Sequence, residues 1–181
     1  MVIGLTGRKG SGKNMACANL PLAAFKPMSF AEPLKSLCKD VFGLEDCDIE
    51  SRELKEKTLT KWPHVSPRIL MQHVGTDLFR KNYPEVWVEH LKRRIFEQGN
   101  NGHIIVTDVR FKNEAEMIYR VGGQIIRIVR PGHEYEVGVD PHSSETEMDD
   151  IDAVKTIKND VTIQLLQARL HAAILELLER K

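Results

Sequence analysis

Short apolar runs and helix-like periodicities alternate over the first part of the chain. Residues Val2–Thr6 form a continuous apolar run that suits a buried parallel strand. Pro27–Phe30 is a second candidate strand, and the residues between the two runs favour a helix over Asn14–Ala24. Ala31–Phe42 follows with its apolar residues on one side of a helix. The pattern therefore predicts strand, helix, strand, helix in this order.

From Asp48 to Gln98 only the helical period remains. It is interrupted at Trp62-Pro63 and at Tyr83-Pro84, where a proline cannot continue the preceding helix. We interpret this stretch, at about residues 48–98, as a helical region inserted into the fold and not as a separate domain.

Alternation returns in the last part of the chain. A stripe of leucine and isoleucine at helical spacing within Ile163–Glu179 predicts core packing. The segment at about 131–150 lacks periodicity and is rich in Gly, His, Ser and acids, which is typical of a lid-like surface segment. The predicted strands are His103–Thr107, Gln124–Val129 and Val154–Ile157, and the predicted helices are Lys112–Val121 and Ile163–Glu179.

This order of elements predicts an α/β fold with three layers. We expect a parallel sheet of about five strands with helices on both faces, and a ligand at the carboxyl ends of the strands. At 181 residues, 41% hydrophobic and 29% charged, the chain suits one globular domain that spans residues 1–181.

Charge and cysteine content narrow the function classes. Lys plus Arg and Asp plus Glu number 26 each, so the chain lacks the bulk positive field of a duplex-binding protein, and a nucleic-acid polymer is not expected as a partner. The three cysteines show no CxxC spacing, which favours reduced thiols over a disulfide framework or a zinc site. The chain opens on a strand and has no apolar run of membrane-spanning length, so we expect a cytoplasmic protein without a membrane partner. Its oligomeric state stays open, a homodimer included.

The residues from Gly7 to Asn14 read Gly-Arg-Lys-Gly-Ser-Gly-Lys-Asn, between a predicted strand and a predicted helix. This is the pattern of a phosphate-binding P-loop, in which backbone N–H groups and the start of the next helix hold the phosphates of a nucleotide such as ATP. Lys13 would add a charge between the β- and γ-phosphates, whereas a plain glycine-rich turn leaves this lysine unexplained. The candidate ATP-binding residues of the loop are Gly7, Arg8, Lys9, Gly10, Ser11, Gly12, Lys13 and Asn14.

Asn14 departs from the P-loop pattern. A Ser or Thr hydroxyl at this position normally ligates the Mg²⁺ that bridges the phosphates. The amide oxygen of Asn14 can also ligate a metal, while Met15 beside it brings no hydroxyl. We therefore treat Asn14 as a candidate metal ligand.

Three polar residues follow the predicted strand His103–Thr107. Asp108 stands at the ligand-binding edge of the sheet, where it could hold Mg²⁺ directly or through water; the alternative is that it caps the next helix. Arg110 could clamp a phosphate through two parallel hydrogen bonds, or form a surface salt bridge with Glu114. Glu114 falls in the first turn of the predicted helix, so the three side chains could converge on one site.

The helical region offers further candidates. Arg68 and Gln72 are four residues apart and share a helical face, although such a polar face is usually only solvated. Trp87 could stack on a base, but the residues alone favour a place in the core. The polar and small residues of this run are Arg68, Gln72, Gly75, Thr76 and Arg80.

Two further groups lie near the predicted lid. Arg127 and Arg130, at the end of the fourth strand, could reach ATP, although Arg127 could equally be a charge on the strand surface. The neighbours His142, Ser143, Ser144 and Glu145 do not form a hydrolytic triad, because no glycine-flanked serine is present; the segment Ser143–Glu147 instead has the composition of a helix cap.

In combination, these segments resemble the bacteriophage deoxynucleoside monophosphate kinases, within the wider group of P-loop nucleoside monophosphate kinases. The likeness runs through most of the chain, and the order of the motifs is more specific than any one of them. It rests on Gly-Ser-Gly-Lys at 10–13, Ser29 to Lys35, Gln72, Gly75-Thr76, Trp87, Thr107 to Phe111, Asn113-Glu114, His142, Ser144-Glu145 and Asn159-Asp160.

The resemblance implies transfer of the γ-phosphoryl group of ATP to a deoxynucleoside 5′-monophosphate, with Mg²⁺. It implies that Ser11 and Lys13 belong to the phosphate loop. Three positions match the catalytic group at a strand end in that family, namely Asp108, Arg110 and Glu114, and together with Lys13 they are the candidate catalytic residues. The positions that match the monophosphate contacts of the family are Arg68, Gln72, Gly75, Thr76 and Trp87. Arg110 and Glu114 are further candidates for the monophosphate, and Arg130 is a candidate for ATP because of its place after the fourth predicted strand.

The chain departs from the family it resembles at two places. Asp and Thr follow the P-loop lysine in that family, whereas this chain has Asn14 and Met15, and Ile69 stands where the family has a basic residue after Arg68. Two alternatives therefore stay open. One is a P-loop kinase for another phosphorylated acceptor, of the dephospho-CoA or phosphomevalonate type, and the other is a nucleotide-binding protein with weakened catalysis.

Overall fold

The computed structural model describes residues 1–18, 25–51, 53–99, 102–132 and 147–179. The chain divides into two compact units: the first comprises residues 1–29 and 91–181, and the second residues 30–90. Most of the helical insertion predicted at about 48–98 falls in the second unit. Most of the predicted lid, at 133–146, lies outside the described residues. The interpretation of these parts as an insertion and a lid of one kinase domain stays a prediction.

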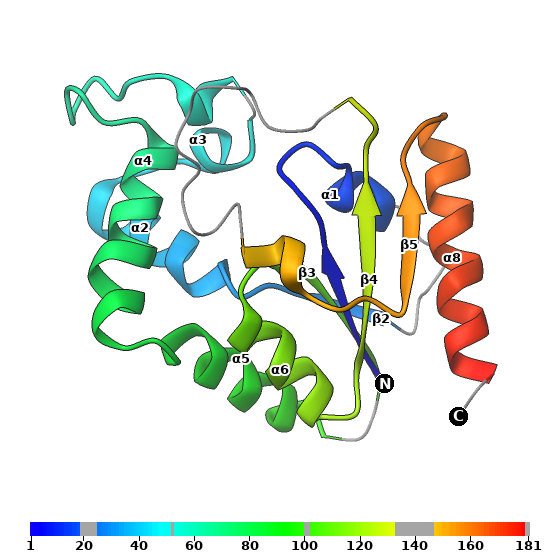
Figure 1. Ribbon diagram of the computed structural model, residues 1–181. Coiled ribbons are helices and arrows are strands. Elements are labelled where there is room, and N and C mark those ends of the chain that lie inside the picture. Colours follow the sequence, from blue (N-terminus) through cyan, green and yellow to red (C-terminus); the bar gives the residue numbers. More distant parts are fainter. Residues whose placement is uncertain (19–24, 52, 100–101, 133–146, 180–181) are drawn as a thin grey trace. The chain divides into compact units, whose positions relative to one another are not determined.

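A five-stranded sheet forms the centre of the first unit (Figure 1). All neighbouring strands are parallel, in the order β2-β3-β1-β4-β5, as the alternation of apolar runs and helices predicts. The carboxyl ends of the strands therefore meet at one edge. The strands are β1 (Val2–Thr6), β2 (Phe25–Met28), β3 (His103–Val109), β4 (Gln124–Val129) and β5 (Lys155–Lys158).

The strand β2 begins two residues earlier than the sequence predicts. Phe25 pairs with His103 and Met28 with Val106, so Ser29 and Phe30, which the prediction placed in the strand, lie beyond the paired residues. Ser29 consequently stands at the carboxyl edge of the sheet.

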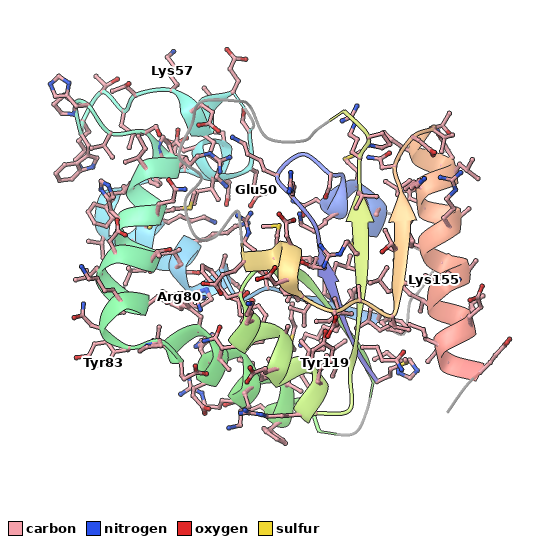
Figure 2. The ribbon with its side chains drawn as sticks, viewed as in Figure 1. Glu50, Lys57, Arg80, Tyr83, Tyr119 and Lys155 are labelled. Atoms are coloured by element: carbon pink, nitrogen blue, oxygen red, sulfur yellow. The ribbon has the colours of Figure 1, made fainter. Side chains whose placement is uncertain are left out.

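Helices α1 (Lys13–Cys17) and α8 (Ile163–Glu179) pack against one face of the sheet. α8 has the bounds that its periodicity predicts, and an ion pair of 2.5 Å between Lys155 and Glu176 joins it to β5 (Figure 2). α1 covers the first residues of the helix predicted over Asn14–Ala24, of which residues 19–24 are outside the described part. The buried core on this face contains Ile3, Leu5, Ile105, Ile126, Ile128 and the predicted stripe Leu166, Leu170, Ile174 and Leu177.

The opposite face of the sheet is covered by α6 (Lys112–Arg120). On this face Gly4 of β1 lies between crowded side chains of the neighbouring strands, because a Cβ there would lie 2.9 Å from Val109 Cγ2 and 3.2 Å from Ile125 Cγ1. Ile118 of α6 is fully buried. With helices on both faces, the first unit has the three layers that the sequence predicts.

The strand β3 carries one extra residue relative to β1. Gly4 pairs with Val106 and Thr6 with Val109, so two steps along β1 correspond to three steps along β3. This β-bulge falls at Thr107 and Asp108, and it places Asp108 inside β3 and not after the strand predicted at His103–Thr107. A bulge breaks the strict alternation of side chains and redirects those at its position.

The second unit is helical. Its own apolar cluster centres on Cys38, Leu44 and Ile49, against which Leu34 and Leu70 pack. The predicted break at Trp62-Pro63 falls between η1 and α4, and that at Tyr83-Pro84 falls between η2 and α5. The helices are α2 (Glu32–Phe42), α3 (Asp46–Glu50), η1 (Leu54–Glu56), α4 (Pro67–Gln72), the π-helix η2 (His73–Arg80) and α5 (Val86–Glu97), which continues into the first unit.

Candidate functional site

The loop that follows β1 turns at glycines with positive φ. The angle is 141° at Gly7, 76° at Gly10 and 99° at Gly12, which is the N-cap of α1. A Cβ at Gly7 would collide with the carbonyl oxygen of Ile128 in β4, so the loop can pass this close only as glycine. The glycines of the sequence pattern are thus required by the shape of the loop.

The ammonium group of Lys13 is folded into this loop. Its Nζ donates to the carbonyl oxygen of Gly7, donates to the carbonyl oxygen of Arg8 at 3.0 Å, and lies 3.5 Å from Ser11 Oγ. The side chain is buried. Phosphate oxygens would offer the ammonium charged acceptors, which form stronger hydrogen bonds than neutral carbonyls do. The arrangement can therefore exchange carbonyl contacts for phosphate contacts.

Asn14 and Met15 lie in the first turn of α1. Both side chains are exposed, Met15 by 47%. Asn14 is therefore accessible from solvent beside the loop. Its predicted part in metal binding stays a prediction.

Asp108 is positioned by a partner that the sequence did not indicate. Ser29, just beyond β2, donates its hydroxyl to Asp108 Oδ2 at 2.7 Å. The alternative interpretation, in which Asp108 caps the next helix, is wrong, because the N-cap of α6 is Phe111. Since β2 and β3 are neighbours, the pair stands at the same edge of the sheet as the loop after β1.

Glu114 lies in the first turn of α6, as predicted, but its carboxylate is only 2% exposed. It accepts the backbone N–H of Arg110 at 2.8 Å and that of Phe111 at 3.1 Å. These bonds satisfy donors at the helix start and fix the chain directly after β3. Glu114 thus holds the backbone from which the Arg110 side chain projects.

The segment η3 (Glu147–Asp150) is attached to the same edge of the first unit. Arg8 of the loop donates to both carboxylate oxygens of Asp149, at 2.6 and 3.2 Å. Lys112 at the start of α6 lies 2.8 Å from Asp150, and this carboxylate raises the pKa of the Lys112 ammonium. The predicted ATP contact of Arg8 would therefore compete with an ion pair inside the protein.

Arg127 and Arg130 have different surroundings. Arg127 donates to the carbonyl oxygens of Asp149, at 3.3 Å, and Ile151, so it supports η3 and its continuation. Arg130 follows β4 and is exposed. His142 and Glu145, quoted for the family resemblance, lie outside the described residues.

One residue near the loop had no role assigned from the sequence. Asn159, in the turn after β5, donates its side-chain amide to the carbonyl oxygen of Ser11 at 2.9 Å. A signal for it exists, because Asn159 follows a predicted strand at the ligand-binding edge, as Asp108 does.

The residues predicted for the monophosphate lie in the second unit, apart from Arg110 and Glu114. Trp87 is 9% exposed, and its indole N–H donates to the carbonyl oxygen of Gly75 at 3.0 Å. Its ring lies 5.4 Å from that of Phe79, so the indole is part of the packing of this unit. Arg68 forms an ion pair of 2.6 Å with Glu56.

Gln72 and Thr76 flank the junction between α4 and the π-helix η2, and both are half-buried. Gly75 packs closely within this unit, where a Cβ would lie 2.5 Å from Leu34 Cδ2. A π-helix is rare and often marks a functional position. The substrate roles of these residues stay predictions.

The oxygen donors of the first unit suit a small hard cation. In the part of the chain that the structure describes, no group of three or more His, Cys, Asp or Glu side chains could hold a metal ion. Mg²⁺ does not need such a group, because it commonly takes one or two carboxylates together with water and substrate phosphates. The Asp108 carboxylate beside the Ser29 hydroxyl therefore fits Mg²⁺ by its chemistry.

The thiols Cys17, Cys38 and Cys47 are all free, as the spacing predicts. Burial raises the pKa of the Cys17 thiol to about 12 and also raises the pKa of Cys38. At neutral pH these two thiols therefore remain protonated.

Over the described residues, the chain contains no helix with the length and apolar character needed to cross a bilayer.

Comparisons with known proteins agree with one another. A family model described as deoxynucleotide monophosphate kinase matches residues 46–170. A protein of Acanthamoeba polyphaga mimivirus, which carries the provisional name deoxynucleotide monophosphate kinase, is 35% identical over 178 residues, 91% of this chain and 91% of the relative. The deoxynucleotide monophosphate kinase of Enterobacteria phage T4 is 31% identical over 108 residues, 58% of this chain and 44% of that protein.

Among solved structures, dephospho-CoA kinase from Campylobacter jejuni aligns with a TM-score of 0.50. The alignment covers 97% of this chain and 96% of that chain, at 19% sequence identity. At this identity the likeness shows the fold alone.

Proposed function

Because the chain belongs to the deoxynucleotide monophosphate kinase family, we propose that it transfers the γ-phosphoryl group of ATP to a deoxynucleoside 5′-monophosphate. The products are ADP and a deoxynucleoside diphosphate. The observation that carries this proposal is the identity of 35% over 91% of the chain to a relative of matching length. An oxygen of the acceptor phosphate forms a bond to the γ-phosphorus, and the bond from that phosphorus to the β,γ-bridging oxygen breaks.

The loop after β1 binds the phosphates of ATP in this proposal. Backbone N–H groups of the loop provide fixed donors, and Lys13 provides a charge at its centre. The contact between Lys13 and the Arg8 carbonyl, at 3.0 Å, supports this role, because the ammonium already lies inside the loop. Positioning and electrostatics account for catalysis, and no general base is needed since the acceptor phosphate is ionised at neutral pH.

In this proposal Asp108 binds the metal ion. Its carboxylate, oriented by Ser29, would hold Mg²⁺ directly or through water, and the amide oxygen of the exposed residue Asn14 is a second candidate ligand. When bound, Mg²⁺ supplies positive charge that neutralises the phosphates of the nucleotide.

In the first unit, the residue that we assign to the acceptor is Arg110. Arg110 is suited to a bidentate contact with a phosphate, and Glu114 sets its place by holding its backbone N–H at 2.8 Å. Arg68 and Gln72 are the proposed monophosphate contacts on α4. We assign Trp87 an indirect part in acceptor binding, because its indole N–H donates to the carbonyl oxygen of Gly75 at 3.0 Å and so fixes this part of the second unit.

The proposed partners are small nucleotides and not a nucleic-acid polymer or a membrane. The phage relative supports the cytoplasm of a host cell as the place of action. The oligomeric state, a homodimer included, is a matter for measurement in solution.

The function is tested with purified protein, ATP, Mg²⁺ and each of the four deoxynucleoside monophosphates in turn, with dephospho-CoA as a control acceptor. We expect a deoxynucleoside diphosphate from at least one acceptor and no product from dephospho-CoA. The likeness to dephospho-CoA kinase extends to the fold only, so it does not predict that this chain phosphorylates dephospho-CoA. Absence of every deoxynucleoside diphosphate, over a wide range of Mg²⁺ concentration, would contradict the proposal.

The double change Asn14→Asp with Met15→Thr tests the metal assignment. It gives the first turn of α1 the carboxylate and hydroxyl of the related kinases, at two exposed positions where new side chains meet no packing constraint. If Asn14 is a weak ligand, the Mg²⁺ concentration for half-maximal rate should fall several-fold. An unchanged Mg²⁺ requirement would contradict the interpretation of Asn14 as a weak metal ligand.

A further inference from the structure

We infer that Asn159 is a positioning residue for ATP. Its side-chain amide fixes the peptide unit between Ser11 and Gly12, so that the N–H of Gly12 faces the phosphates. The inference rests on the proposed function only in taking ATP as the ligand of the loop.

The contact that carries the inference joins two ends of the chain. Asn159 Nδ2 donates to the carbonyl oxygen of Ser11 at 2.9 Å. A carbonyl oxygen only accepts, so the nitrogen of the amide and not its oxygen must face it. Gly12 provides the space, because a Cβ at this residue would lie 2.5 Å from the same nitrogen.

The turn that carries Asn159 is itself fixed. The backbone N–H of Asn159 donates to the carbonyl oxygen of Val129 at 2.7 Å, which ties the turn to β4. On the other side, Arg169 of α8 donates to the carbonyl oxygen of Lys158 at 2.6 Å and to Asp160 at 2.7 Å. The amide of Asn159 therefore projects from a support that is held independently of the loop.

Because of the geometry of the peptide unit, the hydrogen bond from Asn159 to the Ser11 carbonyl also orients the Gly12 N–H. In a trans peptide the C=O and the following N–H point in opposite directions. With the Ser11 carbonyl held toward the turn after β5, the Gly12 N–H must point away from that turn. Without the hydrogen bond, the peptide unit next to a glycine could rotate at little steric cost. Asn159 thus selects the peptide orientation that a phosphate-binding loop requires.

The expected size follows from one neutral hydrogen bond. Such a bond contributes about 1 kcal/mol, which corresponds to about a fivefold change in affinity. The change should appear for ATP and ADP, whose phosphates reach the loop, and not for a deoxynucleoside monophosphate acceptor.

The experiment compares Asn159→Ala and Asn159→Leu with the unchanged protein. Both variants remove the donor, and leucine keeps the branching of the side chain at Cγ with a somewhat larger volume, which separates loss of the hydrogen bond from loss of packing. Binding of ATP, ADP and deoxynucleoside monophosphates is measured by titration calorimetry, with the melting temperature of each variant. Val161→Ala is the control, because it alters a neighbouring residue that is 45% exposed and leaves the Ser11 contact and the Arg169 contacts of the turn in place.

We expect both Asn159 variants to bind ATP and ADP about fivefold more weakly, with acceptor binding within about twofold and Val161→Ala unchanged. Unchanged ATP affinity with a lower melting temperature would show that Asn159 stabilises the fold without orienting the loop for ATP, and would overturn the inference. An equal loss for ATP and acceptor would also overturn it, since that indicates general damage. If the unchanged protein binds ATP but forms no deoxynucleoside diphosphate, the proposed function fails while the comparison of ATP affinities still decides the inference. If it binds no ATP, both fail.

Discussion

Among the single residues of the loop, Gly7 has the least room. Its φ of 141° is uncommon for any residue with a Cβ, and a Cβ would also collide with the carbonyl oxygen of Ile128. Gly122 offers a comparison, because its φ is 71° and nothing lies within 4 Å of a Cβ built there. A comparison of alanine substitutions at Gly7 and Gly122 therefore separates the cost of the positive φ from the cost of the collision with Ile128.

We expect Gly122→Ala to lower the free energy of unfolding by about 1 to 2 kcal/mol, the cost of a left-handed conformation for alanine. Gly7→Ala should lower it by more than about 3 kcal/mol, because the loop or β4 must also move. Urea unfolding of both variants measures the difference. Equal losses would show that the approach of Gly7 to β4 is not restrictive.

Ser29 donates a hydrogen bond that helps to orient Asp108. Its replacement removes this 2.7 Å contact from the carboxylate. For Ser29→Ala we expect the Mg²⁺ concentration for half-maximal rate to rise about fivefold, which corresponds to about 1 kcal/mol. Steady-state rates over a range of Mg²⁺ measure this, with Ser36→Ala, at an exposed serine of α2, as the matched control. A shift of the same size in the control would contradict this role of Ser29.

The residue types at the site could be predicted from the sequence, but their partners could not. Lys13 is recognisable because the P-loop pattern is continuous in sequence. The partner of Asp108 is 79 residues away in the chain, and that of Ser11 is 148 residues away. Nothing local in the sequence specifies such pairs, since the register of the sheet and the turn after β5 bring them together.

At the scale of elements, the short helix α1 depends on α8. Gln167 of α8 donates its side-chain amide to the carbonyl oxygen of Met15 at 2.9 Å, and so supplies a partner to the end of a helix too short to be stable alone. Cys17, the last residue of α1, packs against the same buried cluster as α8. The loop is thereby joined to the C-terminal helix through α1.

This packing predicts a dependence of stability on alkaline pH. Burial raises the pKa of the Cys17 thiol from 9.0 to about 12, so the folded state holds the proton more tightly than the unfolded state. The corresponding stability is complete below pH 9.0 and is lost progressively as the pH rises toward 12. Between about pH 8 and about pH 10 the loss should be about 1 kcal/mol.

Urea unfolding of the unchanged protein and of Cys17→Ala measures this contribution. The variant should lose less stability over the same pH interval, while the contributions of Tyr119 and Lys112, whose pKa values are also raised, are common to both proteins. Parallel pH profiles would show that Cys17 is not protected from ionisation in the folded state.

Element types were predictable where the hydrophobic period is regular, as in β4 and α8, which have the predicted bounds. Two irregular features were not predictable. The bulge at Asp108 adds one residue to β3, and η2 widens the helical turn over His73–Arg80. Both depend on how the chain packs, and neither changes the pattern of apolar residues enough to be recognised. In β3 the irregular feature lies at the site.

At the scale of the whole molecule, equal numbers of acidic and basic residues set the long-range field. The formal net charge is 0 at pH 7, so there is no overall attraction for the phosphates of a duplex. The alternation of elements was likewise enough to predict the parallel sheet, because such crossovers have few topological solutions. The division at residues 30 and 90 was not predicted, since helical periodicity alone does not reveal which helices share a core.

We expect no measurable binding to duplex DNA at about 0.15 M salt, with a dissociation constant weaker than about 10⁻⁴ M. Fluorescence anisotropy of a labelled duplex, titrated with the protein at several salt concentrations, measures this. Tight binding that weakens steeply with salt would reveal a local basic surface and contradict the expectation from net charge.

The packing of Trp87 on Gly75 and Phe79 has a practical consequence. The chain has two tryptophans, Trp62 and Trp87, and both belong to residues 30–90. Trp87 is buried, while Trp62 is 38% exposed, so their emission spectra should differ in wavelength. Ultraviolet fluorescence therefore reports on the second unit without any attached dye, and a spectrometer can observe that part of the protein separately from the sheet that carries the P-loop.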